Sequence, residues 1–451
     1  MDNLTRQLAA YVTSRRFDDI PADIVRSATR HLVDAIGCAL GGRDCEAARI
    51  GRQLACGTAP NRHAGRILGQ RRHVPASEAA FTNTAMIRYL DFNDSWQGGH
   101  PSDLLGGLLA IAESAGADGR RLITAMIVAY EVVIRLIRAT SLRERGWDQG
   151  FVIGVGTTCG AGHLLRLDAE QMTNAIAIIT VANVPLRATR AGQLSSWKGA
   201  ATAFAVRNGV YAALLAAGGM TGPEAAFEGR HGLMKQITGP FELETFPDAG
   251  GDYLLPVIVL KYWPVEGHAQ AAVWAALRLR EEMAPADIAR IEIFTHWSAW
   301  HEAGSEPAKW NPTTRETADH SFPYIFARTL VDGTITVSTF DAANYLDPTL
   351  RPLMAKISVH QDAEIDALYP ATWVMRVEAT AADGEREIIR IINPRGHGMN
   401  PMSDDEVDNK FTALAEPALG TDRTRAALGA WRSIEGATTI SAALDLLLPG
   451  G

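Results

Sequence analysis

The chain has 451 residues, of which 47% are hydrophobic and 21% charged, and its formal net charge is −8 at pH 7. This length favours two globular domains, and the composition argues against a disordered or fibrous protein. The negative charge disfavours nucleic acid and anionic membranes as partners.

The first residues, MDNLTRQLAAYVTSRRFDDIP, lack the long apolar run of a signal peptide. No uncharged apolar run approaches the length of a membrane span. The four cysteines show no CxxC spacing, which suggests neither a zinc ribbon nor a disulfide framework. We therefore expect a cytoplasmic protein without a membrane partner.

The first 270 residues predict a succession of helices, because apolar residues recur at helical spacing. Pro21 suits the first turn of one helix, Ser77 is a fair N-cap of another, and Gly218–Gly219 ends a third. The clearest helical patterns cover residues 21–40, 77–92, 103–116, 120–140 and 195–219.

After about residue 285 the pattern changes. Residues 288–295 alternate as a strand does, and residues 373–393 predict two strands joined through Asp383–Gly384. Residues 347–357 predict a short helical stretch between them. Helices return with Ser403 and Glu406, which are spaced as a capping box.

These elements predict a mainly α fold with two parts. A large helical domain is built from both chain ends, residues 1–269 and 397–451. A smaller α+β lid domain, residues 270–396, is inserted between them. The cleft between two such domains is a favoured place for a ligand.

The stretch YLDFNDSWQGGHPSD, residues 89–103, contains the first candidate groups. His100 precedes Pro101, which suits the first turn of a helix, and the partial positive charge there favours anions and a neutral imidazole. Asp91 could orient that ring or handle a proton itself. The structural alternative is a polar loop with a capping histidine.

Lys198 provides the second signal, because it falls in the first turn of a long predicted helix, where a cation meets the wrong end of the helix dipole. A bound carboxylate would compensate for this. Arg187 and Arg190, just upstream, add donors well shaped for carboxylates. The alternative is a surface lysine whose charged end reaches solvent.

Two further segments combine charge with apolar surroundings. VIVLKYWPVEGHAQ contains Lys261, which either reaches solvent or anchors an anion, together with Glu266, His268 and Gln270. NPTTRETADHSFPYIFARTL gathers Arg315, Asp319, His320 and Tyr324 before a helical stretch. For this second segment, a polar loop with a capping aspartate is an interpretation of equal weight.

Several chemistries lack their motifs. There is no GxGxxG after a strand, no GxxxxGK[ST] and no HExxH, and the cysteines form no cluster motif. We expect side chains to perform the chemistry without a metal or another cofactor.

Together, four segments resemble the MmgE/PrpD family. They are YLDFNDSW…GGHPSD, LSSWKGAATAFAVRNGVYAALLAAGGMTGPEAAFEGRHG, LKYWPVEGHAQAAV and KWNPTTRETADHSFPYIFARTLVDG. They occur in the family's order over roughly residues 80–340. HPSD alone is a weak signal, whereas the ordered set is specific.

The resemblance implies a homodimer and metal-free chemistry on a di- or tricarboxylate substrate. The reactions of such a family are dehydration of 2-methylcitrate, decarboxylation of cis-aconitate and epimerisation of iminodisuccinate. Of these we expect the dehydration, in a carbon–oxygen lyase. The rival from another class is a carboxylate-binding protein without turnover.

The family's active-site positions fall here on Asp91, Ser95, His100, Lys198, Lys261 and Tyr324. Together with the arguments from charge and helix position above, this gives an expected catalytic set of His100, Asp91, Lys198 and Tyr324. The expected substrate-binding set is Ser95, Lys261, Arg187, Arg190, Gln149, His268 and Arg315.

Two positions depart from the family's pattern. Gln149 follows GWD where many dehydratase relatives have histidine, and Gln193 stands where they have glutamate. Both changes fall near the expected pocket, so they bear on the choice of substrate.

Overall fold

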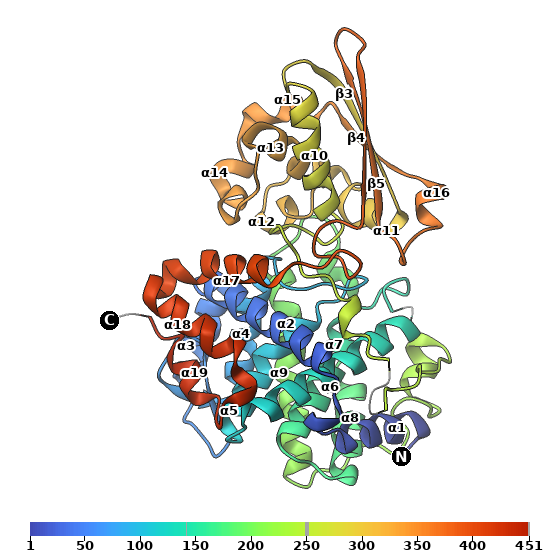
Figure 1. Ribbon diagram of the computed structural model, residues 1–451. Helices are drawn as coiled ribbons and strands as arrows, with labels where there is room; N and C mark the ends of the chain where they lie inside the picture. Colours follow the sequence, from blue (N-terminus) through green and yellow to red (C-terminus); the bar gives the residue numbers. More distant parts are fainter. Residues whose placement is uncertain (141, 249–251, 450–451) are drawn as a thin grey trace.

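The structure is a computed structural model that describes residues 1–140, 142–248 and 252–449. A large helical body lies below a smaller α+β lid, and the N-terminus lies at the end of the body far from the lid (Figure 1). The fold is mainly α, as the sequence predicts.

The body contains helices from both ends of the chain. Its first part comprises α1 (Asn3–Ser14), α2 (Ala22–Gly41), α3 (Glu46–Cys56), α4 (Ala76–Tyr89), α5 (Leu105–Ser114), α6 (Gly119–Ala139), α7 (Gly150–Leu164), α8 (Ala169–Ala182) and α9 (Trp197–Ala217). The chain returns as α17 (Asp404–Leu419), α18 (Thr421–Arg432) and α19 (Ser441–Asp445). Between α3 and α4 lies an antiparallel hairpin of β1 (Ala64–Arg66) and β2 (His73–Pro75).

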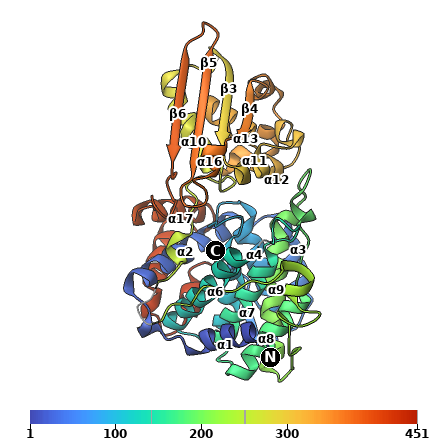
Figure 2. The same cartoon turned by 90° about the vertical axis from the view of Figure 1, so that its right-hand side faces the viewer.

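The lid contains a four-stranded sheet of order β4-β3-β5-β6. Its strands are β3 (Ile288–Thr295), β4 (Ile357–Gln361), β5 (Val374–Ala381) and β6 (Arg386–Ile392). Strand β3 pairs parallel with β4 and antiparallel with β5, which pairs antiparallel with β6. Figure 2 shows the sheet standing above the body.

Helices accompany the sheet. Helix α10 (Gln270–Glu282) packs against β5, β6 and α13 (Phe322–Asp332). The shorter helices are α11 (Trp297–Ala303), α12 (Arg315–Ala318), α14 (Ala342–Tyr345), α15 (Arg351–Met354) and α16 (Ala363–Asp366).

The helices of the two chain ends share one hydrophobic core. Phe411 and Trp431, from the C-terminal helices, are fully buried in the same cluster as Leu32 and Ile36 of α2. A Cβ atom added at Gly37 would lie 3.2 Å from the Phe411 Cα, so α2 and α17 approach closely. The lid has its own core, which runs from Val265 to Ile391. On this basis we propose that the domain boundaries lie near residues 269 and 396.

Local signals in the sequence are matched by specific contacts. Ser403 and Glu406 form the predicted capping box of α17. Gly384 joins β5 to β6 with a φ of +97°, a conformation that suits glycine. Helix α15 lies inside the predicted helical stretch 347–357.

Three details differ from the sequence analysis. Helix α4 begins at Ala76 with Pro75 as its N-cap, so Ser77 lies inside the helix. Pro21 is the N-cap of α2, which begins at Ala22, so it precedes the first turn. Strands β1, β2 and β4 were not predicted, because three to five residues are too few to establish an alternating pattern.

Among the described helices, α9 is long and apolar enough to cross a membrane, and 61% of its most apolar window is buried inside the protein. It packs against α4, α7 and α8 and contains Lys198 and Arg207. A buried core helix meets the same criteria of length and composition.

Candidate active site

An inner cavity of 30 Å³ lies where the body meets the lid. Its walls come from the end of α4 and the segment that joins α4 to α5, from two arginine-bearing segments of the body, and from the lid and the irregular segment leading to it. They are lined by Arg88, Asp91, Ser95, Gly98, His100, Arg143, Arg187, Arg190, Glu266, Gly267, His268, Glu302 and His320.

Asp91 is the anionic centre of this site. It follows the end of α4 with a φ of +49°, a left-handed conformation that aspartate adopts more readily than most residues. Its carboxylate forms an ion pair with Arg88, and Lys261 Nζ lies 3.1 Å from Oδ2. Lys261 Nζ also donates a hydrogen bond of 2.7 Å to the Asp91 carbonyl.

This environment keeps Asp91 ionised. Burial alone would raise the pKa of Asp91, but Arg88, Lys198 and Lys261 outweigh it and hold the pKa well below its ordinary value. Asp91 therefore acts as a fixed negative charge that orients cations, and it is a poor proton acceptor.

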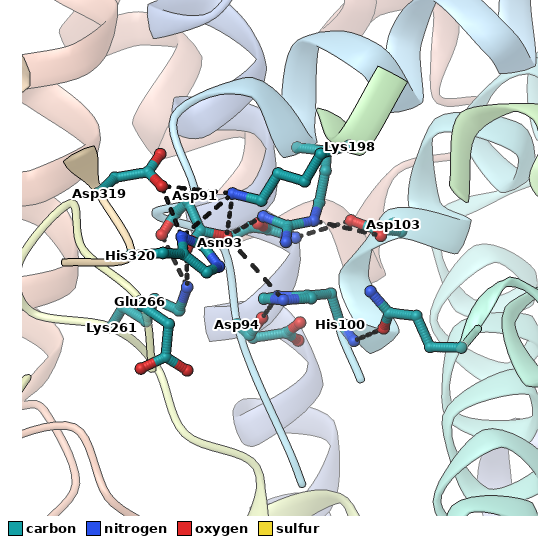
Figure 3. Close-up of polar contacts among 12 residues, drawn as sticks. Asp91, Asn93, Asp94, His100, Asp103, Lys198, Lys261, Glu266, Asp319 and His320 are labelled. Carbon is teal, nitrogen blue, oxygen red and sulfur yellow. Dashed lines mark hydrogen bonds and ion pairs between the residues drawn. The ribbon is translucent and has the colours of Figure 1, made fainter. Parts of the chain in front are cut away.

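Lys198 extends from the first turn of α9 into the same cluster and is only 2% exposed. Its Nζ lies 3.4 Å from Asp319 Oδ1 and 3.8 Å from Asp91 Oδ1. His320 Nδ1 lies 2.5 Å from the same Asp319 oxygen. Figure 3 shows these side chains converging. Two carboxylates thus compensate for the unfavourable position of Lys198 at the helix N-terminus.

His100 has a defined tautomer. Its Nδ1 lies 2.7 Å from the Asp94 carbonyl oxygen, which only accepts hydrogen bonds, so Nδ1 carries the proton. Nε2 carries the lone pair, accepts no hydrogen bond from the residues that the structure describes, and lies 4.0 Å from Asp91 Oδ1. Burial, Arg88 and Lys261 lower the pKa of His100 well below its ordinary value. The imidazole is therefore neutral in the free protein, with the Nε2 position unprotonated.

Asp94 and Gln149 hold His100 in place. Asp94 accepts hydrogen bonds of 2.9 Å and 2.6 Å from the Ser102 backbone and hydroxyl, and 2.9 Å from the Tyr130 hydroxyl. Gln149 Oε1 accepts a 2.7 Å bond from the His100 backbone N–H. Gln149 therefore positions His100 through its oxygen, and its Nε2 has no hydrogen-bond partner among the described residues.

Besides Arg88, three arginines of the body line the cavity. Arg190 is held by Asp148, at 2.6 Å from Nε to Oδ2. Arg187, which begins the short 3₁₀ helix Arg187–Arg190, and Arg143 both form ion pairs with Glu302 of α11. The arginine side chains therefore lie on the cavity wall already paired with carboxylates of the protein.

Ser95, Glu266 and His268 also line the cavity. Ser95 is fixed by two backbone hydrogen bonds of 2.9 Å with Val259. Burial raises the pKa of Glu266, which favours its protonated form. Burial and Arg143 lower the pKa of His268 to about 3, so this ring is neutral.

Tyr324 and Arg315 are not brought to this cavity, and Lys198 and Lys261 approach Asp91 without being among the lining residues. The Tyr324 hydroxyl donates a 2.5 Å hydrogen bond to the Thr339 carbonyl, and its ring belongs to the lid core. Burial raises the pKa of Tyr324, so the phenol stays protonated. Arg315 lies over the ring of Tyr89, 4.9 Å from its centroid, and lines a neighbouring pocket of 320 Å³ together with Arg88 and Lys198.

Three residues of this site were not predicted from the sequence: Arg88, Arg143 and Glu302. Arg88 had a detectable signal, since it stands three residues before Asp91 at the end of a helical pattern. Arg143 and Glu302 have no such signal, because the two partners are 159 positions apart.

Among the described residues, Asp91, Asp319 and His320 place one potential metal-ligand atom each within 4.8 Å of the others. The same carboxylates face Lys198, and Asp91 also faces Arg88 and Lys261. These cations already neutralise the negative charge that a divalent ion would require.

The site thus combines a neutral imidazole and a fixed carboxylate with buried cations, where the helical body meets the lid. The chain belongs to the MmgE/PrpD family: residues 6–245 match the MmgE/PrpD N-terminal domain, and residues 263–433 match the MmgE/PrpD C-terminal domain.

Curated relatives narrow the activity to a class. The chain is 30% identical over 425 residues to a 2-methylcitrate dehydratase of Cupriavidus necator, covering 84% of this chain and 86% of the relative. It is 31% identical over 364 residues to that of Escherichia coli K12, covering 75% and 74%. A cis-aconitate decarboxylase-like protein of Aspergillus oryzae is 25% identical over 478 residues, covering 99% and 97%. At the level of the family, these relatives support a dehydratase, which is a lyase.

Proposed function

We propose that this protein is a metal-independent hydro-lyase that dehydrates a citrate-like tricarboxylate, namely 2-methylcitrate to 2-methyl-cis-aconitate. One observation carries the proposal: the unprotonated Nε2 of a neutral His100 at a cavity whose lining includes four arginines, Arg88, Arg143, Arg187 and Arg190. Such a group can accept a proton from a carbon atom beside a carboxylate held by those cations.

The cations have two tasks. Lys198, Lys261 and the arginines of the wall bind substrate carboxylates, which fixes the reacting carbon relative to His100. They also stabilise the negative charge that grows on a carboxylate as the neighbouring carbon loses its proton. Asp91 keeps Lys198 and Lys261 close together by pairing with both.

The elimination balances with two proton-transfer groups. His100 Nε2 takes the proton from carbon, the electron pair of that C–H bond forms the new double bond, and the hydroxyl leaves the adjacent carbon. The departing oxygen takes a proton from an acid and leaves as water. Glu266 suits this role, because it lines the cavity and burial raises its pKa.

The test is a panel of acids incubated with pure protein. 2-Methylcitrate, citrate, cis-aconitate and iminodisuccinate are analysed by mass spectrometry and chiral chromatography. We expect loss of water from 2-methylcitrate and a rising absorbance from the conjugated alkene. Turnover of none of these acids would contradict the proposal and favour a carboxylate-binding protein.

A decarboxylase is the second candidate, and the Aspergillus oryzae relative supports it because the similarity spans nearly the whole of both chains. Gln149 is the residue to examine, since it replaces a histidine expected in dehydratase relatives and contacts the His100 backbone. Release of CO₂ from cis-aconitate without hydration or dehydration would select this activity. Loss of optical rotation from iminodisuccinate would select the epimerase.

We further propose a cytoplasmic homodimer. Trp197, Phe204 and Tyr211 stand seven residues apart on α9, and their side chains are 46%, 45% and 54% exposed. Such spacing places them on one face of the helix, and this supports an interface with a second copy. Light scattering should give twice the chain mass, and Phe204→Glu should give the monomer with unchanged helical circular dichroism. A monomeric wild type would contradict the proposal.

A further inference from the structure

Glu302 makes a contact that ties the lid to the body. It lies in α11 of the lid, its side chain is 14% exposed, and it forms ion pairs with both Arg143 and Arg187. Burial alone would raise the pKa of Glu302, but the two arginines lower it to about 2. Glu302 therefore presents a permanent carboxylate to two guanidinium groups.

These two arginines stand between two cavities. The inner cavity of 30 Å³ contains the site of His100, whereas an outer groove of 510 Å³ is lined by Trp297 and Tyr369 of the lid. Arg143, Arg187 and Gly98 line both. A molecule that passes from the groove to the inner cavity must therefore pass the arginines and the carboxylate that they hold.

The inner cavity is too small for a tricarboxylate, since small-molecule pockets typically measure about 300–1,000 Å³. Substrate entry thus requires the lid and body to separate around it. Two guanidinium groups share one carboxylate here, and Arg143 Nε has no hydrogen-bond partner among the described residues. The pair is suited to exchange one carboxylate for another.

We propose that Glu302 is an internal competitor of the substrate: it occupies the carboxylate site formed by Arg143 and Arg187 until a substrate carboxylate displaces it and frees the lid. This proposal rests on the proposed function only in taking a di- or tricarboxylate as the ligand. The ion pair acts as a latch that a monocarboxylate opens poorly, because a monocarboxylate cannot bind both this pair and the inner cations.

The opposite role is also physically reasonable, and it predicts the opposite result. If Glu302 only positions the two arginines for the substrate, its removal weakens carboxylate binding. If Glu302 competes with the substrate, its removal strengthens binding, since the fraction of protein with free arginines rises. The sign of the change in affinity therefore separates the two roles.

The experiment measures the binding of propane-1,2,3-tricarboxylate by calorimetry to the full chain. This probe has no hydroxyl and cannot be dehydrated. Glu302→Gln keeps the size of the side chain and removes its charge, and we expect the Kd to fall on the order of tenfold. Glu306→Gln removes a charge from the segment after α11 and should leave the Kd unchanged. Propionate should show no comparable gain.

The arginines provide the second part of the test. Arg187→Gln in the Glu302→Gln background should raise the Kd for the tricarboxylate at least about tenfold, because a charged hydrogen bond is lost. Hydrogen exchange of α11 without ligand should be faster in Glu302→Gln than in the wild type, since the lid contact is lost.

An equal or weaker affinity of Glu302→Gln for the tricarboxylate would overturn the competitor role. The proposed dehydration can be contradicted without contradicting the proposed role of Glu302. If Glu302→Gln binds the tricarboxylate more tightly while no member of the acid panel is turned over, the latch stands and the dehydratase proposal falls.

Discussion

Three buried carboxyl groups around His100 differ because their neighbours differ. Asp91 faces three cations, and its pKa lies well below the ordinary value. Asp103 is buried with Arg88 farther away, at 3.8 Å, and burial raises its pKa to about 6. Glu266 also has a raised pKa through burial. One residue class thus supplies a fixed charge and candidate proton donors at a single site.

Replacement of His100 tests the base. His100→Ala should lower kcat about 10²–10⁴-fold, the usual contribution of a positioned acid or base, because no proton acceptor replaces Nε2. Stability should fall by only about 1–3 kcal/mol in urea titrations, because the buried Asp94 carbonyl loses its hydrogen bond from Nδ1. A near-normal kcat on the true substrate would reduce His100 to a structural residue and move the chemistry to Lys198 or Glu266.

Lys198 should behave differently, because it binds charge in the free protein as well as in the complex. Lys198→Ala should raise KM and lower kcat. It should also destabilise the fold by about 3–5 kcal/mol, since Asp91 and Asp319 would lose their shared cation inside the protein. Steady-state kinetics and urea unfolding check both effects, with Lys198→Arg as the charge-preserving control. A changed KM without loss of stability would mean that the lysine serves the ligand alone.

At the scale of elements, the segment that carries Asp91 and His100 is fixed at both ends by α4 and α5. These helices approach closely at Gly106, where an added Cβ would lie 2.5 Å from the Thr84 backbone nitrogen. Asn83 reinforces the contact, because its Nδ2 donates to the Gly106 carbonyl at 3.3 Å. The position of the catalytic segment therefore depends on a helix pair that tolerates no side chain at the crossing.

Gly106→Ala tests this dependence. Overpacking between α4 and α5 should lower the free energy of unfolding by about 1–3 kcal/mol and reduce activity, because the segment between the helices shifts. Gly429→Ala in α18 is the matched control, since an added Cβ meets nothing within 4 Å there. That variant should be stabilised by about 0.5–1 kcal/mol. Equal stability changes in urea titrations of the two variants would contradict the account.

At the scale of the whole molecule, the site exists only where the body and lid meet. His100 and Lys198 come from the body, whereas Asp319, His320 and Glu302 come from the lid, and Lys261 from the segment that leads to it. Domain motion that separates the two parts therefore takes the catalytic groups apart as well as opening the cavity.

Whether the activity requires a metal depends on the charges that surround Asp91. Both oxygens of the Asp91 carboxylate already face cations of the protein: Arg88 and Lys198 at Oδ1, and Lys261 at Oδ2. We therefore expect activity to survive treatment with a chelator, followed by assay in metal-free buffer. A stoichiometric metal in active protein, with activity lost on its removal and restored on its return, would contradict this expectation.

The sequence by itself determined the mainly α class, the long helices and the strands β3, β5 and β6, because helical and alternating periodicities are properties of neighbouring residues. It also singled out His100, Asp91, Lys198 and Lys261, whose charges stand out against apolar surroundings. The structure brings these four residues together, and their catalytic roles stay predictions.

Only the tertiary structure decided how these groups are held. The Asp94 carbonyl sets the tautomer of His100, Glu302 joins Arg143 to Arg187, and the Thr339 carbonyl binds the Tyr324 hydroxyl away from the cavity. Hydrogen bonds and ion pairs depend on distances of a few ångströms between atoms. Such distances between remote segments are fixed only when the helices and the lid pack together, so no local pattern in the chain encodes them.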